Sequence, residues 1–230
     1  MPKTYKTEII GYTFSELSDE VKQKIYENDN FFSEMVDFSP IEDTFRADLM
    51  ECFGVDPDTL EVYYDVSYSQ GSGACCVGEL DVETVFEKRV GSYFTGILNL
   101  IESGQVVVDT IKIVRCGPSN YYNHENTCKV EIEYVNDPTE VDAWDIEDAE
   151  ELEEMLTNAI REELSIFHRG LYDHYEESTS FEAYCEITED HTVYTEDGKV
   201  VDPAFIKNAS VFDGYQLKLD FKDHTDYNFT

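Results

Sequence analysis

The stretch LEVYYDVSYS at residues 60–69 alternates between mostly apolar side chains at even positions and more polar ones at odd positions. This period of two is typical of a strand with one buried face. The segment QGSG at residues 70–73 follows as a turn signal, and a second strand pattern runs from Ala74 to Val82. The two runs predict an antiparallel hairpin.

Outside this hairpin the apolar spacing predicts helices over 19–28, 41–53 and 83–103, and a long acidic helix from Asp145 to at least Phe167. Further strands are expected over 7–14, 106–115, 127–135 and 215–221, with a turn at 193–200. We therefore expect the α+β class, with a mostly antiparallel sheet built from hairpins and packed by three or four helices. No linker rich in Pro, Gly or Ser divides the chain, so residues 1–230 are expected to form a single α+β domain.

The charge is strongly negative and unevenly distributed. The chain has 16 Lys and Arg against 51 Asp and Glu, a formal net charge of −35. This charge disfavours direct binding to nucleic acid or to an anionic membrane, because both carry the same sign. From Asp137 to Gly198 there are 21 acidic residues and only two bases, Arg161 and Arg169. This concentration of negative charge favours a binding surface rather than an evenly distributed solubilising charge. Such a surface would bind a basic partner.

The long helix carries four carboxylates on one face, because Glu147, Glu150, Glu151 and Glu154 fall at i, i+3, i+4 and i+7. Like charges at this spacing repel, and no Lys or Arg lies among them. The row resembles the phosphates of a nucleic-acid strand, although a plain solvated face would look the same. The candidate partner-binding residues are Asp145, Glu147, Asp148, Glu150, Glu151, Glu153, Glu154, Glu176 and Glu177.

Patterns for catalysis and metal binding are missing from the sequence. The five histidines form no H-x-x-x-H pair, and no C-x-x-C, phosphate-loop or dinucleotide motif occurs. We expect no catalytic residue, metal site or cofactor, and we interpret the six cysteines as reduced core thiols. Residues 1–14 lack a secretory signal and no segment could span a bilayer, so a cytoplasmic location is expected.

The loop between the first two strands is a second candidate site, with Tyr68, Gln70, Gly71, Ser72 and Gly73. One interpretation is a glycine bulge that bends the sheet and lets two backbones approach. The other is a polar pocket that also uses Cys76 and His124. Such a pocket would be favoured if Arg46, Arg89 and Arg115 gathered around the loop.

Three stretches resemble a family of uncharacterised phage-encoded proteins. They are Tyr68-Ser69-Gln70-Gly71-Ser72-Gly73-Ala74, similar to that family's S-Q-G-D-G-A hairpin, then Tyr12-x-Phe14-x-Glu16-Leu17-Ser18-Asp19-Glu20-x-Lys22, and Tyr194-Thr195-Glu196-Asp197-Gly198-Lys199. The resemblance implies a phage origin, and hence the cytoplasm of a host cell, but no settled activity. Ser72 stands where the family usually has Asp, which weakens the case for a catalytic carboxylate in this loop.

The function expected from the sequence is a non-enzymatic, phage-type acidic inhibitor. It would bind and occlude a basic, nucleic-acid-binding host protein of a defence or transcription system, as a DNA mimic does. Two alternatives stay open: a small enzyme or nucleotide-binding protein that uses the pocket at residues 70–73, and a structural or assembly protein with a tyrosine-rich interface. The sequence leaves the target and the oligomeric state open.

Overall fold

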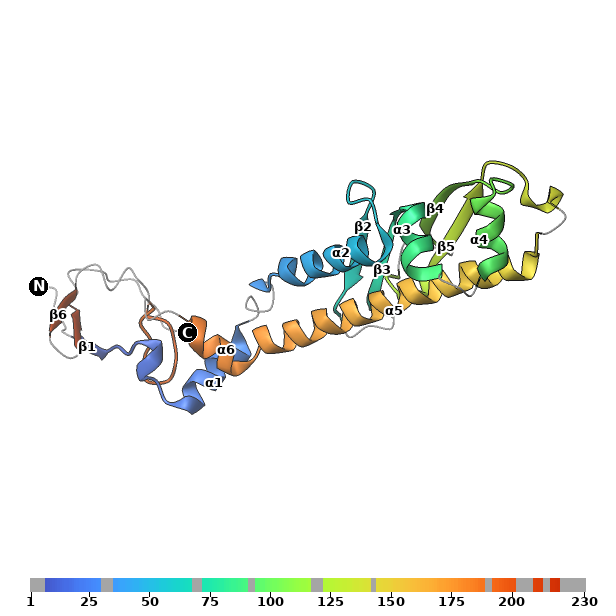
Figure 1. Cartoon of the computed structure of the whole chain (residues 1–230). Coiled ribbons are helices and arrows are strands. Elements are labelled where there is room, and N and C mark those ends of the chain that lie inside the picture. Colours follow the sequence, from blue (N-terminus) through green and yellow to red (C-terminus); the bar gives the residue numbers. More distant parts are fainter. Residues whose placement is uncertain are drawn as a thin grey trace, which may run out of the picture. The chain divides into compact units, whose positions relative to one another are not determined.

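The computed structural model describes residues 7–29, 35–67, 72–90, 94–116, 122–141, 144–188, 192–201, 209–212 and 216–219 (Figure 1). Its contacts group the chain into two compact units, one of residues 37–175 and one of residues 1–36 with 176–230. The single domain expected from the sequence stays a prediction. The expected α+β class is confirmed.

The larger unit contains a four-stranded antiparallel sheet in the order β2-β3-β4-β5. Its strands are β2 Glu61–Asp65, β3 Gly73–Leu80, β4 Val108–Arg115 and β5 Cys128–Tyr134. The predicted hairpin is confirmed, with Glu61 opposite Val77. The strands expected over 106–115 and 127–135 pair in the same way, with Ile111 opposite Ile132.

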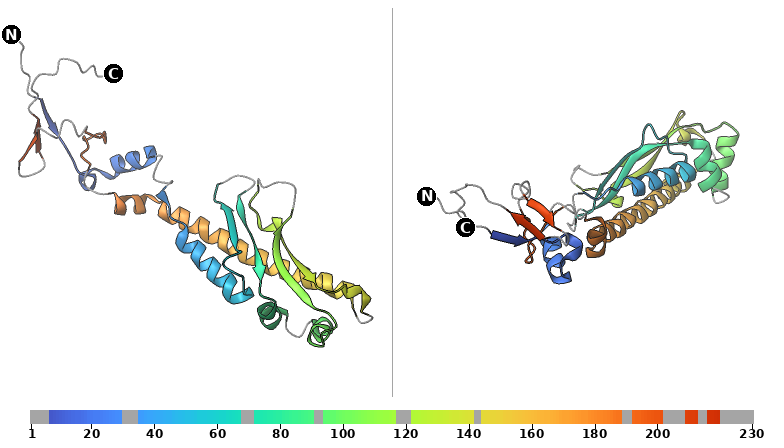
Figure 2. Two further views of the ribbon diagram at one scale, coloured as in Figure 1. Left: turned by 90° about the horizontal axis from the view of Figure 1, so that it is seen from above. Right: turned by 90° about the vertical axis from the view of Figure 1, so that its left-hand side faces the viewer.

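Helices α2 and α5 cover one face of this sheet (Figure 2). The helical segments of the unit are α2 Ser39–Phe53, α3 Val82–Val85, a π-helical turn Phe86–Val90, α4 Thr95–Glu102 and α5 Ile146–Ser178. The core between helices and sheet includes the fully buried residues Leu49, Phe53, Cys76, Ile111, Leu156 and Ile160. On the opposite face, Lys112 forms a 2.9 Å ion pair with Glu133. The sheet therefore has one apolar face and one polar face, as the alternating sequence predicts.

The predicted end of α2 at Gly54 is confirmed. Gly54 has a φ of +63°, and its N–H donates to the carbonyl of Met50. A Cβ at this position would lie 2.8 Å from the Cβ of Asp81. The left-handed conformation and the close packing both require glycine here.

The single helix predicted over residues 83–103 is wrong. The structure divides this stretch into α3, the π-helical turn and α4. The consecutive bases Lys88 and Arg89 donate to the carbonyls of Glu51 and Cys52, at the C-terminal end of α2. The Arg89 guanidinium also lies 4.1 Å from the Phe53 ring centroid. Both bases lie in the π-helical turn, so their contacts with α2 hold the segment where the regular α-helix ends.

The smaller unit contains α1 Asp19–Asn28, a 3₁₀ turn Phe14–Glu16, α6 Phe181–Ile187 and a three-stranded antiparallel sheet in the order β1-β7-β6. The strands are β1 Thr7–Ile10, β6 Ala209–Phe212 and β7 Gln216–Leu219. The backbones of Tyr12 and Tyr194 exchange two 2.8 Å hydrogen bonds. This bridge joins the N-terminal and late stretches of the phage-family resemblance.

Candidate functional site

The two faces of α5 differ sharply in burial. The predicted apolar stripe is confirmed, and its fully buried members include Leu152, Leu156 and Leu171. The four carboxylates expected on one face, Glu147, Glu150, Glu151 and Glu154, are all exposed. We call these four residues the acidic face. Their exposure follows from the helical spacing of the sequence.

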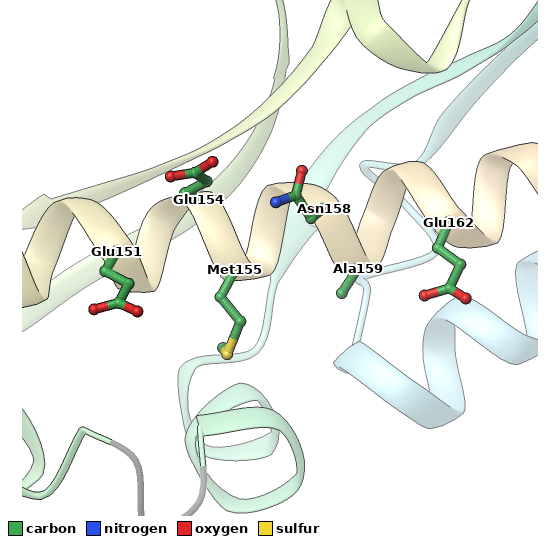
Figure 3. Close-up of a pocket in the computed structure, with 6 residues that line it drawn as sticks. All are labelled: Glu151, Glu154, Met155, Asn158, Ala159 and Glu162. Atoms are coloured by element: carbon green, nitrogen blue, oxygen red, sulfur yellow. The ribbon is translucent and has the colours of Figure 1, made fainter.

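A shallow pocket of about 470 Å³ lies along the acidic face. It is lined by Glu151, Glu154, Met155, Asn158, Ala159 and Glu162 (Figure 3). Glu162 therefore extends the negative surface by two helical turns beyond Glu154. Glu162 is not among the residues predicted from the sequence, because the neutral Asn158 interrupts the i, i+4 series 154, 158, 162.

Asp145 and Asp148 have positions that differ from those of the acidic face. The Asp145 side chain accepts hydrogen bonds from the backbone N–H groups of Glu147 at 2.9 Å and Asp148 at 3.4 Å. It therefore caps α5. Asp148 is half-buried, and its carboxylate would lie 3.8 Å from a Cβ at Gly96 of α4.

Glu153 faces the sheet rather than the solvent. Its carboxylate accepts a 2.9 Å hydrogen bond from the backbone N–H of Ile132. One turn later the Thr157 hydroxyl accepts from the Val130 N–H at 2.9 Å. A further turn on, Arg161 Nε donates to the Cys128 carbonyl at 3.0 Å.

These three bonds align α5 with the outer edge of β5. Four helical residues advance about 6 Å, and two strand residues advance about 6.8 Å, so successive turns of the helix meet alternate residues of the strand. An unpaired strand edge is a template for aggregation. Side chains of α5 cover this edge. Glu153 therefore stabilises the fold, and it lies on a different side of the helix from the acidic face.

Glu176 and Glu177 are exposed near the end of α5. They belong to the smaller unit. The structure thus groups four of the nine candidate partner-binding residues as a continuous exposed row, adds Glu162 to them, and gives Asp145 and Glu153 intramolecular partners.

The base of the loop between β2 and β3 is anchored to α5. The Ser72 hydroxyl donates to the Asp65 carbonyl at 2.5 Å and lies 3.4 Å from His168 Nε2. The Tyr172 hydroxyl donates to the Ser67 carbonyl at 2.9 Å. Because the Ser72 proton is given to a carbonyl, His168 does not activate this hydroxyl as a nucleophile. The candidate residues Tyr68, Gln70 and Gly71 lie outside the described residues.

Gly73 supports the structural interpretation of this loop. A Cβ at Gly73 would collide with the backbone carbonyl oxygen of Asn123 and lie 2.9 Å from the Cα of His124. The expected close approach of two backbones is confirmed at this glycine.

The three arginines whose clustering would favour a pocket have separate partners. Arg46 binds Glu42 and the Leu60 carbonyl, Arg89 binds the Cys52 carbonyl, and Arg115 lies 5.0 Å from the Tyr63 ring centroid and donates to the Tyr122 carbonyl. Each guanidinium is therefore held by its own structural contacts.

The side chains expected to complete the pocket are also engaged elsewhere. Cys76 is fully buried in the core, and His124 Nδ1 accepts from the Asn126 N–H at 3.2 Å. All six cysteines are free thiols. A hydrogen bond with Cys128 and burial raise the pKa of Cys75, so its reactive thiolate is rare.

The described residues contain no group of three His, Cys, Asp or Glu side chains arranged to hold a metal ion. None of the helices in these ranges is long and apolar enough to cross a membrane.

A family model described as a domain of unknown function, DUF8835, matches residues 40–181. The chain belongs to this family. The DUF8835 match runs from α2 to the start of α6, and so includes the four-stranded sheet, the acidic face and the loop after β2. Neither the curated proteins nor the solved structures include a match to this chain.

Proposed function

We propose that this protein is a phage-type acidic inhibitor, which binds and occludes a basic, nucleic-acid-binding host protein through the acidic face of α5. The observation that carries the proposal is the charge spacing. Glu147 and Glu154 are seven residues apart, or about 10.5 Å along the helix axis, and this stretch holds four exposed carboxylates. Their axial spacings of about 4.5, 1.5 and 4.5 Å average about 3.5 Å. This axial density of negative charge is close to the roughly 3.4 Å per phosphate along one strand of DNA.

The carboxylates are also held on a rigid support. The opposite side of α5 is buried in the core, and Thr157 and Arg161 bind the edge of β5. Arg161 directs its guanidinium at the backbone carbonyls of Cys128 and Asn126. A fixed row of charges needs little ordering when it binds, which favours affinity.

The net charge of −35 adds long-range attraction for a basic partner. Such attraction raises association rates at low salt and weakens as ionic strength rises. Occlusion would follow because the partner's basic groove cannot hold the helix and a nucleic acid together.

The proposal is tested by affinity capture from host lysate with the tagged protein at low and high salt, followed by binding measurements with the captured protein. The test variant replaces Glu147, Glu150, Glu151 and Glu154 with Gln. The matched control is Asp43→Asn, Asp48→Asn, Glu83→Gln and Glu87→Gln, which removes four exposed charges elsewhere in the same unit.

We expect a salt-sensitive, nucleic-acid-binding partner whose affinity falls at least tenfold more in the test variant than in the control. The partner should also lose its nucleic acid when the wild-type protein is added. Equal losses in the two variants would show that general charge, rather than the acidic face, accounts for binding. A partner that binds equally well at high salt would contradict the electrostatic mechanism.

A further inference from the structure

The two edges of the four-stranded sheet differ in how they are covered. At β5, side chains of α5 occupy backbone groups of the outer edge. At the other rim (Figure 2), β2 pairs with β3 and with no second strand in the part of the chain that the structure describes. An edge strand presents a row of backbone N–H and C=O groups that can pair with another chain.

The side chains of β2 give this edge a definite chemistry. The Tyr64 ring lies 5.6 Å from the ring of Phe167 of α5, so Val62 and Tyr64 face the helices. Glu61, Tyr63 and Asp65 therefore lie on the opposite face of the sheet. Two carboxylates therefore flank a tyrosine on one side of a five-residue edge strand. The Tyr63 hydroxyl donates to Glu61, and Asp65 accepts from the N–H of Ser67 at 2.7 Å.

We infer that the edge of β2 accepts an extended basic segment of the partner as an additional antiparallel strand. This inference rests on the proposed function, because it assigns a second contact to the same basic partner. Lys or Arg at alternate positions of the added strand would lie opposite Glu61 and Asp65, and opposite charges in such cross-strand pairs are stabilising.

A second copy of the chain fits this edge poorly. A symmetric antiparallel pair of β2 strands centred on Tyr63 would place Glu61 opposite Asp65 of the other copy at both ends. Like charges directly opposite are destabilising, so the edge discriminates against self-association and in favour of a basic strand.

The probe is a capped nine-residue peptide that alternates Lys and Val. Its matched control has the same sequence and charge, with every backbone nitrogen methylated, so that neither of its edges can pair as a strand. Binding is measured by fluorescence anisotropy, and hydrogen exchange is followed at the amides of Val62 and Tyr64. These two face outward, because the backbone of Cys76, opposite Val62, faces Cys128 on the other side of β3. We expect the unmodified peptide to bind at least tenfold more tightly and to slow exchange at these amides.

The charge contribution is tested with Glu61→Gln combined with Asp65→Asn, which keeps both hydrogen-bond acceptors. This variant should bind the Lys–Val peptide several-fold more weakly than the equally charged control Asp43→Asn with Asp48→Asn. The fourfold Gln variant of the acidic face should retain slowed exchange at β2. The peptide could bind at β2 while the acidic face has no role in partner capture. That result would overturn the proposed function of the acidic face and still support strand addition at β2.

Three results would overturn the inference. One is equal affinity for the methylated and unmodified peptides, which would reduce the contact to general charge attraction. Another is binding without slower exchange at the outward-facing amides of Val62 and Tyr64. The third is exchange at these amides that slows with protein concentration in the absence of peptide, because that would assign the edge to a second copy of the chain.

Discussion

The carboxylate of Glu153 accepts a 2.9 Å hydrogen bond from the backbone N–H of Ile132 on the edge strand β5. Glu153 lies between Glu151 and Glu154 of the acidic face, yet it belongs to a different surface of α5. Neighbouring glutamates of this helix therefore differ in role: Glu153 binds the sheet, whereas Glu151 and Glu154 are exposed. Substitutions at these positions should have different effects on stability and on binding.

Replacing Glu153 with Ala should lower the free energy of unfolding by about 1–3 kcal/mol, because the Ile132 N–H loses its partner. Glu153→Gln keeps an acceptor and should cost less. The free energies are measured by urea unfolding with circular dichroism. Equal losses for Ala and Gln would contradict the hydrogen-bonding role.

Gly73→Ala should destabilise the protein by about 1–3 kcal/mol, because the new Cβ collides with the backbone of Asn123 and His124. Gly96→Ala is the matched control, since its Cβ would meet only Asp148 at 3.8 Å and it lies within α4. That control should be neutral or raise stability by up to about 1 kcal/mol. Thermal unfolding distinguishes the two variants, and a harmless Gly73→Ala would contradict the close backbone approach.

Replacing the acidic face with Gln should leave the fold intact and raise stability slightly at low salt. The i, i+3 and i, i+4 pairs repel by a few tenths of a kcal/mol each, so the sum is about 1 kcal/mol. The gain should shrink in 1 M NaCl, where charges are screened. Urea unfolding at both salt concentrations tests this, and a loss of stability would show that these carboxylates have structural partners.

Asp81 makes a contribution to stability that depends on pH. Hydrogen bonds from the Thr84 side chain and backbone N–H, at 2.6 Å and 2.8 Å, lower its pKa below the usual 3.8. A lowered pKa in the folded state stabilises the fold above the unfolded value, and this contribution is lost as the pH falls below about 3.8. The stability of the wild type relative to Asp81→Asn should therefore decrease as the pH falls from 5 to 3. Thermal unfolding across this range measures it, and a pH-independent difference would refute the assignment.

Much of the fold follows from local sequence patterns. The alternation at residues 60–69 predicts β2 and its buried face, and Gly54 predicts the end of α2. The division of residues 83–103 into separate helical segments does not follow from local patterns. Lys88 and Arg89 bind the end of α2, and no local sequence signal predicts this contact. The same reason applies to Arg46, Arg89 and Arg115, whose separate partners have no local sequence signal.

The sequence by itself determined the hairpins, the two faces of α5 and the row of exposed carboxylates, because periods of 2 and 3.6 residues fix which side chains share a face. Only the tertiary structure decided that Glu153 and Arg161 cover β5 and that β2 lies at the other rim. Both features depend on the tertiary placement of α5 beside the edge of β5. The contacts of α5 with β5 join residues 21 to 33 positions apart, and no repeating pattern in the chain encodes them.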